Sequence, residues 1–505
     1  MSTKRWTLLA VCLGTFMLLL DITVVNVALP DIQRELDASF TDLQWVVDAY
    51  SLMLASVLLT AGSLADLFGR RRVFAIGLAL FSLASLLCGL SATPTVLNLA
   101  RGFQGLGGAV MFACAPALIA QEYEGRERAG AFGVWGATIG AAVAVGPLVG
   151  GALTESLGWE WIFFVNVPIG VLTIVVTLLK LHEYRPETRP RVDWAGAVTF
   201  SGGLFCLVFA LIRGNAEGWG SAPIVALLVA SAALLIAFVV VERLGPEPML
   251  DLSLFRKPAF TGAQIAAFSI SASMFSMFLY LTLYMQNVLR YSPFQAGLRF
   301  LPVSVLSFFA APLAARLTNR VPVRVLIFGG LAAVGTGLLL MGGVSPSSEW
   351  TTLLAGFLIA GTGVGFVNAP LSYAAVSVVE QRLSGTASGI NNTFRQVGIA
   401  TGIAGLGALF QSHVTDQLES RLAGAPVPAG AARGLGEAVA SGGAQQAIES
   451  VPPSARRVVE EAATRAFLDG FNHIIVVAAL IAFAGAVLSL LLIRDRDLTA
   501  PGPPA

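Results

Sequence analysis

Charged residues are scarce in this 505-residue sequence: 12% of its residues are Asp, Glu, Lys or Arg, against 56% that are hydrophobic. A water-soluble domain carries about 25% charged residues, roughly twice that share. The formal net charge of +1 also leaves no basic field of the kind that attracts nucleic acid. The composition excludes a soluble protein and indicates an integral protein of a lipid bilayer with no nucleic acid partner.

Histidine, lysine and cysteine are scarce as well. The three histidines, His182, His413 and His473, show no metal-ligand spacing with one another or with a cysteine, so we expect no metal site and no metal-dependent membrane enzyme. None of the three lysines follows a glycine, which excludes the GxxxxGK[ST] loop of an ATP-driven pump. We expect no cofactor. The four cysteines lie inside apolar runs and read as packing residues: Cys12, Cys88, Cys114 and Cys206.

Long apolar runs, in contrast, are abundant. At 1.5 Å per residue, fourteen of them are long enough to cross a hydrocarbon core of about 30 Å. They fall into groups of six, two and six, which predicts an all-α polytopic membrane protein with 14 transmembrane helices. The runs are 6–29, 45–65, 73–92, 95–121, 129–153 and 161–180; 194–213 and 222–241; and 259–289, 294–316, 323–342, 351–379, 384–411 and 467–493.

The arginines gather in alternate loops, which by the positive-inside rule places both termini in the cytoplasm. We predict an N-terminal six-helix bundle over 1–185, two extra helices and a cytoplasmic loop over 186–257, and a C-terminal six-helix bundle over 258–505. A long extracytoplasmic loop, about 412–466, reads as a spacer whose last part, 454–469, is an amphipathic helix leading into the final span. The turn "LADLFGRRR" of the first six-helix bundle has a degenerate echo, "AARLTNRVPVR", at the same place in the second. Two related six-helix bundles imply a substrate path between them near the bilayer midplane.

Asp21, in "LLLDITVVNVALP", is a carboxylate in the middle of a lipid-soluble run. A charge there costs roughly 2.5–3.5 kcal/mol even on lenient insertion scales, so it should face a cavity, pair with a cation or carry a proton. Helical rise places Asp21 ~13 Å, and Arg101 of "LNLARGFQGLGGA" ~9 Å, from the outer ends of their helices. The pair is therefore either a permanent salt bridge or a site where proton or substrate exchange takes place. Asp48 is a shallower second acid, and for it the structural role is favoured.

Two glycine-containing motifs follow. In "GSLADLFGRRR", Gly62, Asp66, Gly69 and Arg70 form a candidate cytoplasmic gate. In "GPLVGGAL", small residues four apart permit close helix approach and the proline removes a backbone hydrogen bond, which suits an interface that seals and reopens, although static packing explains it as well. The candidate hinge residues of that motif are Gly146, Pro147, Gly150 and Gly151.

The C-terminal block has a polar cluster of its own, "INNTFRQVG", in which Arg395 has no acid at matching depth. Lining of a cavity and interhelical hydrogen bonding are equally compatible with it. Methionines and aromatics of "SMFSMFLYLTLYMQN" could wrap variable apolar ligands, but in a membrane such a stripe is more often in contact with lipid or packed in the core. Candidate substrate-cavity residues are Asn26, Tyr50, Gln104, Met274, Tyr280, Tyr284, Asn368, Asn391 and Arg395.

Together, "LLDITVVNVALP", "GSLADLFGRRR", "RGFQGLGGA", "GPLVGGAL" and "WEWIFFVNVPIG" resemble the major facilitator superfamily, in particular its fourteen-helix drug/proton antiporter branch. The resemblance covers the whole series of spans. It implies that Asp21 is the protonatable coupling acid and Arg101 its partner. It also implies that Asp66 and Arg70 belong to the cytoplasmic gate, and that "GPLVGGAL" is the antiporter hinge.

The function expected from residues and resemblance is a proton-coupled antiporter that exports hydrophobic drugs or antibiotics across a bacterial cytoplasmic membrane by alternating access. Its partners would be a small hydrophobic substrate, protons and the lipid bilayer, and we expect a monomer. The alternative is a metabolite or nutrient transporter, working by uniport or symport, on the same fold.

Overall fold

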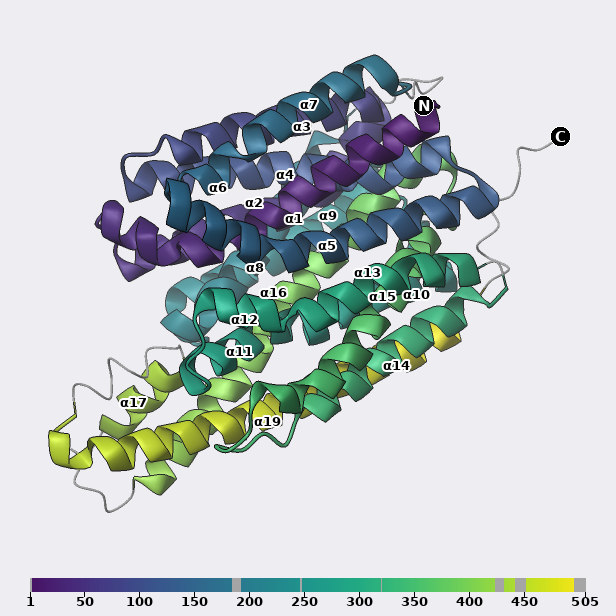
Figure 1. Cartoon of the computed structure of the whole chain (residues 1–505). Coiled ribbons are helices and arrows are strands. Elements are labelled where there is room, and N and C mark those ends of the chain that lie inside the picture. Colours follow the sequence, from purple (N-terminus) through teal and green to yellow (C-terminus); the bar gives the residue numbers. More distant parts are fainter. Residues whose placement is uncertain are drawn as a thin grey trace.

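The computed structural model describes residues 2–183, 192–245, 248–318, 320–422, 431–440 and 451–494. Every regular element in these ranges is a helix (Figure 1). Twelve stretches of the described chain are long and apolar enough to cross a membrane. Two further helices lie among them, one of 33 residues (Gly125–Leu157) and one of 17 (Leu301–Leu317).

The helices follow one another with short connections in the N-terminal part. The order is α1 (Thr3–Glu35), α2 (Phe40–Phe68), α3 (Arg70–Gly89), α4 (Pro94–Glu122), α5 (Gly125–Leu157), α6 (Trp161–Phe164) and α7 (Asn166–Lys180), followed by α8 (Trp194–Glu217) and α9 (Ala222–Leu244).

The C-terminal part is more interrupted. The order is η1 (Leu252–Arg256), α10 (Pro258–Ile270), η2 (Ser271–Phe275), α11 (Ser276–Leu283), η3 (Tyr284–Val288), α12 (Pro293–Arg299), α13 (Leu301–Leu317), α14 (Val323–Met341), η4 (Trp350–Leu353), α15 (Leu354–Ser377), η5 (Gln381–Leu383), α16 (Ser384–Arg421), α17 (Ala431–Ala440) and α19 (Pro453–Leu492). The expected helix over 259–289 is present, with two π-helical segments, η2 and η3, inside it.

The molecule divides into two halves, each with its own core. One core is built from α1–α5 around side chains such as Phe74, Phe81 and Phe132, and the other from α10–α19 around side chains such as Phe260 and Phe357. Figure 1 shows the purple and blue helices α1–α7 on one side and the green and yellow helices on the other. The halves meet where α5 packs on α13 and where α16 packs on α2 and α4.

Helix α8 contacts both halves. Its Ser201 hydroxyl lies 2.9 Å from the Thr60 hydroxyl of α2, and its Asn215 donates to the Ala404 carbonyl of α16 at 3.1 Å. The α8–α9 pair therefore lies against the α2/α16 seam.

One end of the bundle, called here the N end, contains the start of α1. Tyr123, after α4, donates to the Lys4 carbonyl there at 2.7 Å, and Arg71 of α3 donates to the Leu181 carbonyl after α7 at 3.2 Å. The start of α16 reaches the same end, as the contacts of Asp66 below establish. Helix α17 lies at the opposite end (Figure 1).

The segment expected to be a long loop, about 412–466, contains helices. Residues 412–421 continue α16, 431–440 form α17, and 453–466 belong to α19, which runs without interruption into the last span. The amphipathic helix expected over 454–469 is therefore the first part of α19. Residues 423–430 and 441–450 lie outside the described part of the chain.

Candidate functional site

Asp21 lies in the interior of α1, with 2% of its surface exposed. Arg101 of α4, 1% exposed, donates from Nη1 to Asp21 Oδ2 at 2.5 Å. The two residues that the sequence places at similar depth are thus in direct contact. An unpaired charge at this depth would be costly, and the neighbouring opposite charge offsets that cost.

Two amides complete the carboxylate's surroundings. Gln104 Nε2 and Asn166 Nδ2 both donate to Asp21 Oδ1, at 2.7 and 3.0 Å. Both amides also donate to the Ser85 hydroxyl, at 3.1 and 3.0 Å. Asp21 therefore accepts three hydrogen bonds from α4 and α7, and α3 supplies the acceptor that orients the two amides.

Arg101 has partners other than Asp21. Its Nε donates to the Val46 carbonyl at 2.8 Å, and its Nη1 also donates to Gln104 Oε1 at 2.7 Å. The Tyr50 ring lies with its centroid 4.3 Å from the guanidinium carbon, a cation–π distance. Besides Asp21, Arg101 therefore has two acceptors and an aromatic face.

Asp48 lies outside this network. Its side chain is half-buried on α2, and among the described residues it makes no ion pair or hydrogen bond. The nearby cation on α8, Arg213, bonds instead to Glu217 at 3.0 Å.

A second polar site ties the two halves together at the N end. Asp66, at the end of α2, accepts from Arg70 at 2.8 and 3.0 Å. It also accepts from the backbone N–H groups of Gly385 and Thr386, at 3.0 and 2.8 Å, in the first turn of α16. Arg70 reaches across to the Gln381 carbonyl at 2.5 Å. A carboxylate suits this position because the first N–H groups of a helix have no intrahelical acceptor.

Glycine makes this approach possible. A Cβ at Gly62 would lie 2.3 Å from the Gly385 carbonyl oxygen, and one at Gly389 would lie 2.7 Å from the Leu58 carbonyl oxygen. Gly69 has φ = 101°, which a residue with a side chain rarely adopts, and this turn starts α3 directly after α2. Gly62 and Asp66 therefore contact α16, Arg70 reaches η5 just before it, and Gly69 forms the turn beside them.

The α5 glycines lie at helix crossings. A Cβ at Gly146 would lie 1.8 Å from Thr23 Oγ1, and one at Gly150 would lie 3.2 Å from Val24, both on α1. A Cβ at Gly151 would lie 3.2 Å from an aromatic ring of α12, in the other half. This part of α5 therefore packs closely on α1 and reaches the C-terminal half.

Residues 11–403 match the Major Facilitator Superfamily. The chain belongs to this superfamily. It is 38% identical over 421 residues to the multidrug resistance protein Stp of Mycobacterium tuberculosis, covering 83% of this chain and 78% of that protein. It is 32% identical over 491 residues to the tetracenomycin C resistance and export protein of Streptomyces glaucescens, covering 96% and 91%.

The fold agrees with the family. The crystal structure of the human organic anion transporter MFSD10 matches with a TM-score of 0.63 at 14% identity, covering 96% of this chain and 99% of that one. A major facilitator chain with these apolar helices and bacterial relatives is a multi-pass transporter of a bacterial cytoplasmic membrane, and not an enzyme.

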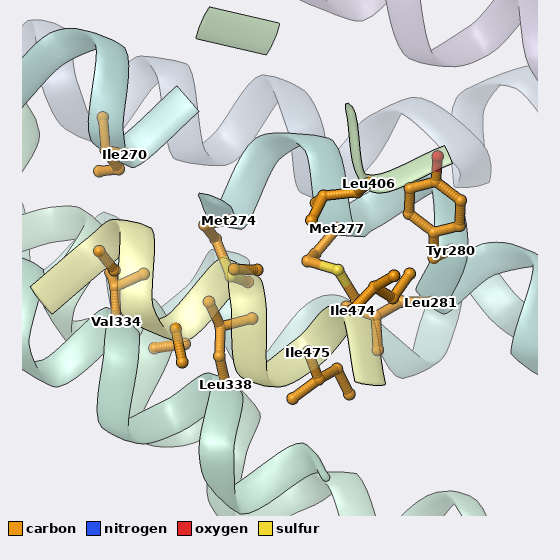
Figure 2. Packing of buried hydrophobic residues seen from close by; sticks show 14 of the residues in the cluster. Ile270, Met274, Met277, Tyr280, Leu281, Val334, Leu338, Leu406, Ile474 and Ile475 are labelled. Atoms are coloured by element: carbon orange, nitrogen blue, oxygen red, sulfur yellow. The ribbon is translucent and has the colours of Figure 1, made fainter. Parts of the chain in front are cut away.

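Three candidate cavity residues of this transporter, Met274, Tyr280 and Tyr284, are packed in its C-terminal core, which is the role that the sequence favours for this stripe. Met274 and Tyr284 have no exposed surface, and Tyr280 has 4%. Figure 2 shows Met274 and Tyr280 among apolar side chains such as Leu338 and Ile475. Tyr284 stacks on a phenylalanine of α19, and Tyr280 donates to a carbonyl of α16. Apolar composition alone does not separate packing from ligand contact, because both environments are apolar.

Tyr50 and Gln104, two other candidate cavity residues, are buried as well. They are 1% and 0% exposed and belong to the Asp21 network, so they support the acid and do not line an open path. The side chains of Asn26 and Pro147 lie outside the described part of the structure.

Asn368, Asn391 and Arg395 form a third polar group. Arg395 Nη1 donates to Asn368 Oδ1 at 2.9 Å and its Nε to Asn391 Oδ1 at 3.4 Å. Asn391 in turn donates to Gln264 of α10 at 3.1 Å. Unlike Met274 and Tyr284, which are packed in the core, these three candidate residues form one polar cluster, on α15 and α16.

Sequence reasoning missed Asn166 and Ser85 as members of the Asp21 site. Asn166 is 0% exposed and bonds directly to the acid. An asparagine inside the apolar run "WIFFVNVPIG" was the available signal. Ser85 carried no comparable signal in the sequence, because serine is common in membrane helices, where its hydroxyl can donate a hydrogen bond to a backbone carbonyl.

Proposed function

We propose that this transporter exports hydrophobic drugs or antibiotics in exchange for protons, by alternating access, with no cofactor beyond the proton gradient. Two relatives are named for multidrug resistance and for resistance to and export of tetracenomycin C. The observation that carries the proposal is the Asp21 site, a membrane-buried carboxylate whose cationic partner keeps other acceptors.

In this proposal Asp21 carries the proton and Arg101 is its charge partner. Protonation weakens the tie between α1 and α4, because only an ionised carboxylate attracts the guanidinium strongly. Helix α1 packs on α5, and α5 packs on α13 of the other half. A change in the protonation of Asp21 can therefore be transmitted through α1 and α5 to the interface between the halves. The crossing at Gly146 and Gly150 acts as the hinge.

Access alternates in the same proposal by breaking the N-end contacts. Asp66 and Arg70 hold α16 at that end, so this arrangement is closed to the cytoplasm. Opening requires Asp66 to leave the first turn of α16 as the halves rock. Asp48 is a secondary acid at most.

The topology belongs to the proposal too. Counting α5 and α13 with the twelve apolar stretches gives 14 crossings, in the order six, two, six, with both termini cytoplasmic. The bundles are 1–185 and 258–505, joined by the two helices of 186–257, and the working unit is a monomer.

Asp21→Asn tests the coupling. In proteoliposomes with an imposed pH gradient, the wild type should accumulate drugs from a panel that includes tetracenomycin C, ethidium and puromycin, and Asp21→Asn should lose gradient-driven uptake. The amide keeps the size of the carboxylate but cannot exchange a proton. Asp31→Asn makes the same chemical change in α1, at an acid paired with Arg34, and should transport normally.

Gradient-driven accumulation by Asp21→Asn at the wild-type rate would refute the coupling role. Accumulation in the direction of proton flow, and not against it, would favour a symporter of metabolites or nutrients over the exporter.

A further inference from the structure

Arg395 is a cation in the membrane interior without a carboxylate. Among the described residues it forms no ion pair, and its hydrogen-bond partners are the neutral side chains of Asn368 and Asn391. It lies eleven residues into α16, ~16 Å from the helix start at 1.5 Å per residue, about half of a ~30 Å hydrocarbon core. The position is the one at which an uncompensated charge is most costly, which marks it as functional by default.

The neighbouring contacts show which way Arg395 faces. Asn392, about 60° away around α16, donates to the Phe112 carbonyl of α4 in the other half at 3.1 Å. Asn391, about 40° away on the other side, bonds to Gln264 of α10 in its own half. Arg395 lies between these directions and therefore points to the seam between the two halves.

The guanidinium has donors to spare. The two amide oxygens use Nε and one N–H of Nη1, whereas a guanidinium has five N–H groups. Arg395 is half-buried and not fully buried like Arg70 or Arg101, so a water-sized space reaches it. A charge with free donors beside such a space has what a ligand anion needs.

We propose that Arg395 is an anion-binding subsite of the transport path, which takes a carboxylate, phenolate or sulfonate group on an aromatic or otherwise hydrophobic substrate. This rests on the proposed export function and deepens it by assigning a substrate class, the amphipathic acids. Asn368 and Asn391 position the guanidinium, whose planar fork suits bidentate binding of an oxyanion. The cluster offers amphipathic cations no acid.

Equilibrium binding of three probes with one fluorophore tests the assignment: dansylglycine, its methyl ester and dansylcadaverine, which are acidic, neutral and cationic. Full-length purified protein in detergent is titrated with each, and empty micelles are subtracted. The wild type should prefer dansylglycine over the other two by roughly 10-fold, the scale of one charge-assisted contact.

Two variants should abolish that preference by different routes. Arg395→Gln removes the charge. Asn368→Asp leaves Arg395 in place but supplies a carboxylate at the atom that already lies 2.9 Å from Nη1, so the subsite becomes occupied from within. Arg299→Gln is the matched control, because it removes another arginine of the same half, which bonds to the Gln295 carbonyl and lies against Tyr291.

The proposal is overturned if the wild type binds dansylglycine no better than its ester, if it shows no saturable binding of the acid, or if Asn368→Asp keeps the preference. Loss in Arg395→Gln alone would mean that Arg395 acts through packing. Because binding needs no pH gradient, a failure of proton coupling leaves this result standing, and drug export without acid preference refutes only the subsite.

Discussion

At the scale of single residues, neutral amides are the unusual feature of the Asp21 site. Gln104 and Asn166 donate to the same carboxylate oxygen, Oδ1, and leave Oδ2 to Arg101. An amide N–H can donate to a carboxylate or to the carbonyl oxygen of a neutral acid. The amides therefore hold the Asp21 carboxylate in one orientation.

Asn166→Ala should weaken this site while the ion pair remains. A hydrogen bond to a charged group contributes about 1.5–3 kcal/mol, so we expect the free energy of unfolding to fall by about that amount and gradient-driven transport to fall with it. Thermal unfolding in detergent and uptake by proteoliposomes measure the two effects. Asn98→Ala on α4 is the control, since the Asn98 side chain makes no hydrogen bond within the described structure; equal losses in both variants would contradict the role of Asn166.

At the scale of helices, glycine allows close approach at two crossings. Gly62 and Gly389 let α2 and α16 touch backbone to backbone near the N end, and Gly146 lets α5 lie against the Thr23 side chain of α1 further along. In lipid there is no hydrophobic driving force between helices, so they associate through close van der Waals packing, which small residues at the crossings permit. The obstacle differs, however: at α2/α16 it is a carbonyl oxygen, whereas at α5/α1 it is the side chain of Thr23.

This difference makes the α5/α1 crossing testable by rescue. Gly146→Ala places a methyl group on Thr23, and overpacking of this kind costs typically ~1–3 kcal/mol. We expect transport to fall by roughly that free energy, ~5- to 150-fold at RT ≈ 0.6 kcal/mol, and to recover in the double variant with Thr23→Gly, which removes both clashing atoms, Oγ1 and Cβ.

Gly130→Ala, also in α5, meets no atom within 4 Å and should be neutral. Failure of Thr23→Gly to restore any transport to Gly146→Ala would show that the close crossing is not what Gly146 provides.

At the scale of the whole molecule, the sequence predicts helix positions well inside the hydrocarbon core and less well outside it. Apolar runs located the helices because a hydrocarbon core requires them. The ends of α16 and α19 extend beyond those runs, as far as Arg421 and Pro453, because helix packing outside the membrane places no limit on polarity. Met274 is a candidate both for the core and for a cavity by sequence, because apolarity does not distinguish core from path, and the structure places it in the core.

The buried charges show the same division. A single carboxylate and a single guanidinium at similar depth have few partners to choose from, so Asp21 and Arg101 could be matched from helical rise alone. The contacts of Asp66 with α16 could not, because its acceptor role depends on how two halves dock over a separation of more than 300 residues.

The sidedness of the whole molecule is the last expectation to test. The N end should face the cytoplasm, since arginines such as Arg71 and Arg72 lie there. In intact cells that express a cysteine-free parent, Gly434→Cys on α17, an exposed position at the opposite end, should react with a membrane-impermeant maleimide. Arg72→Cys, 59% exposed in the native side chain, should react only after permeabilisation. The reverse pattern would place Asp66 and the first turn of α16 outside, and the N-end contacts would then close the molecule to the exterior and not to the cytoplasm.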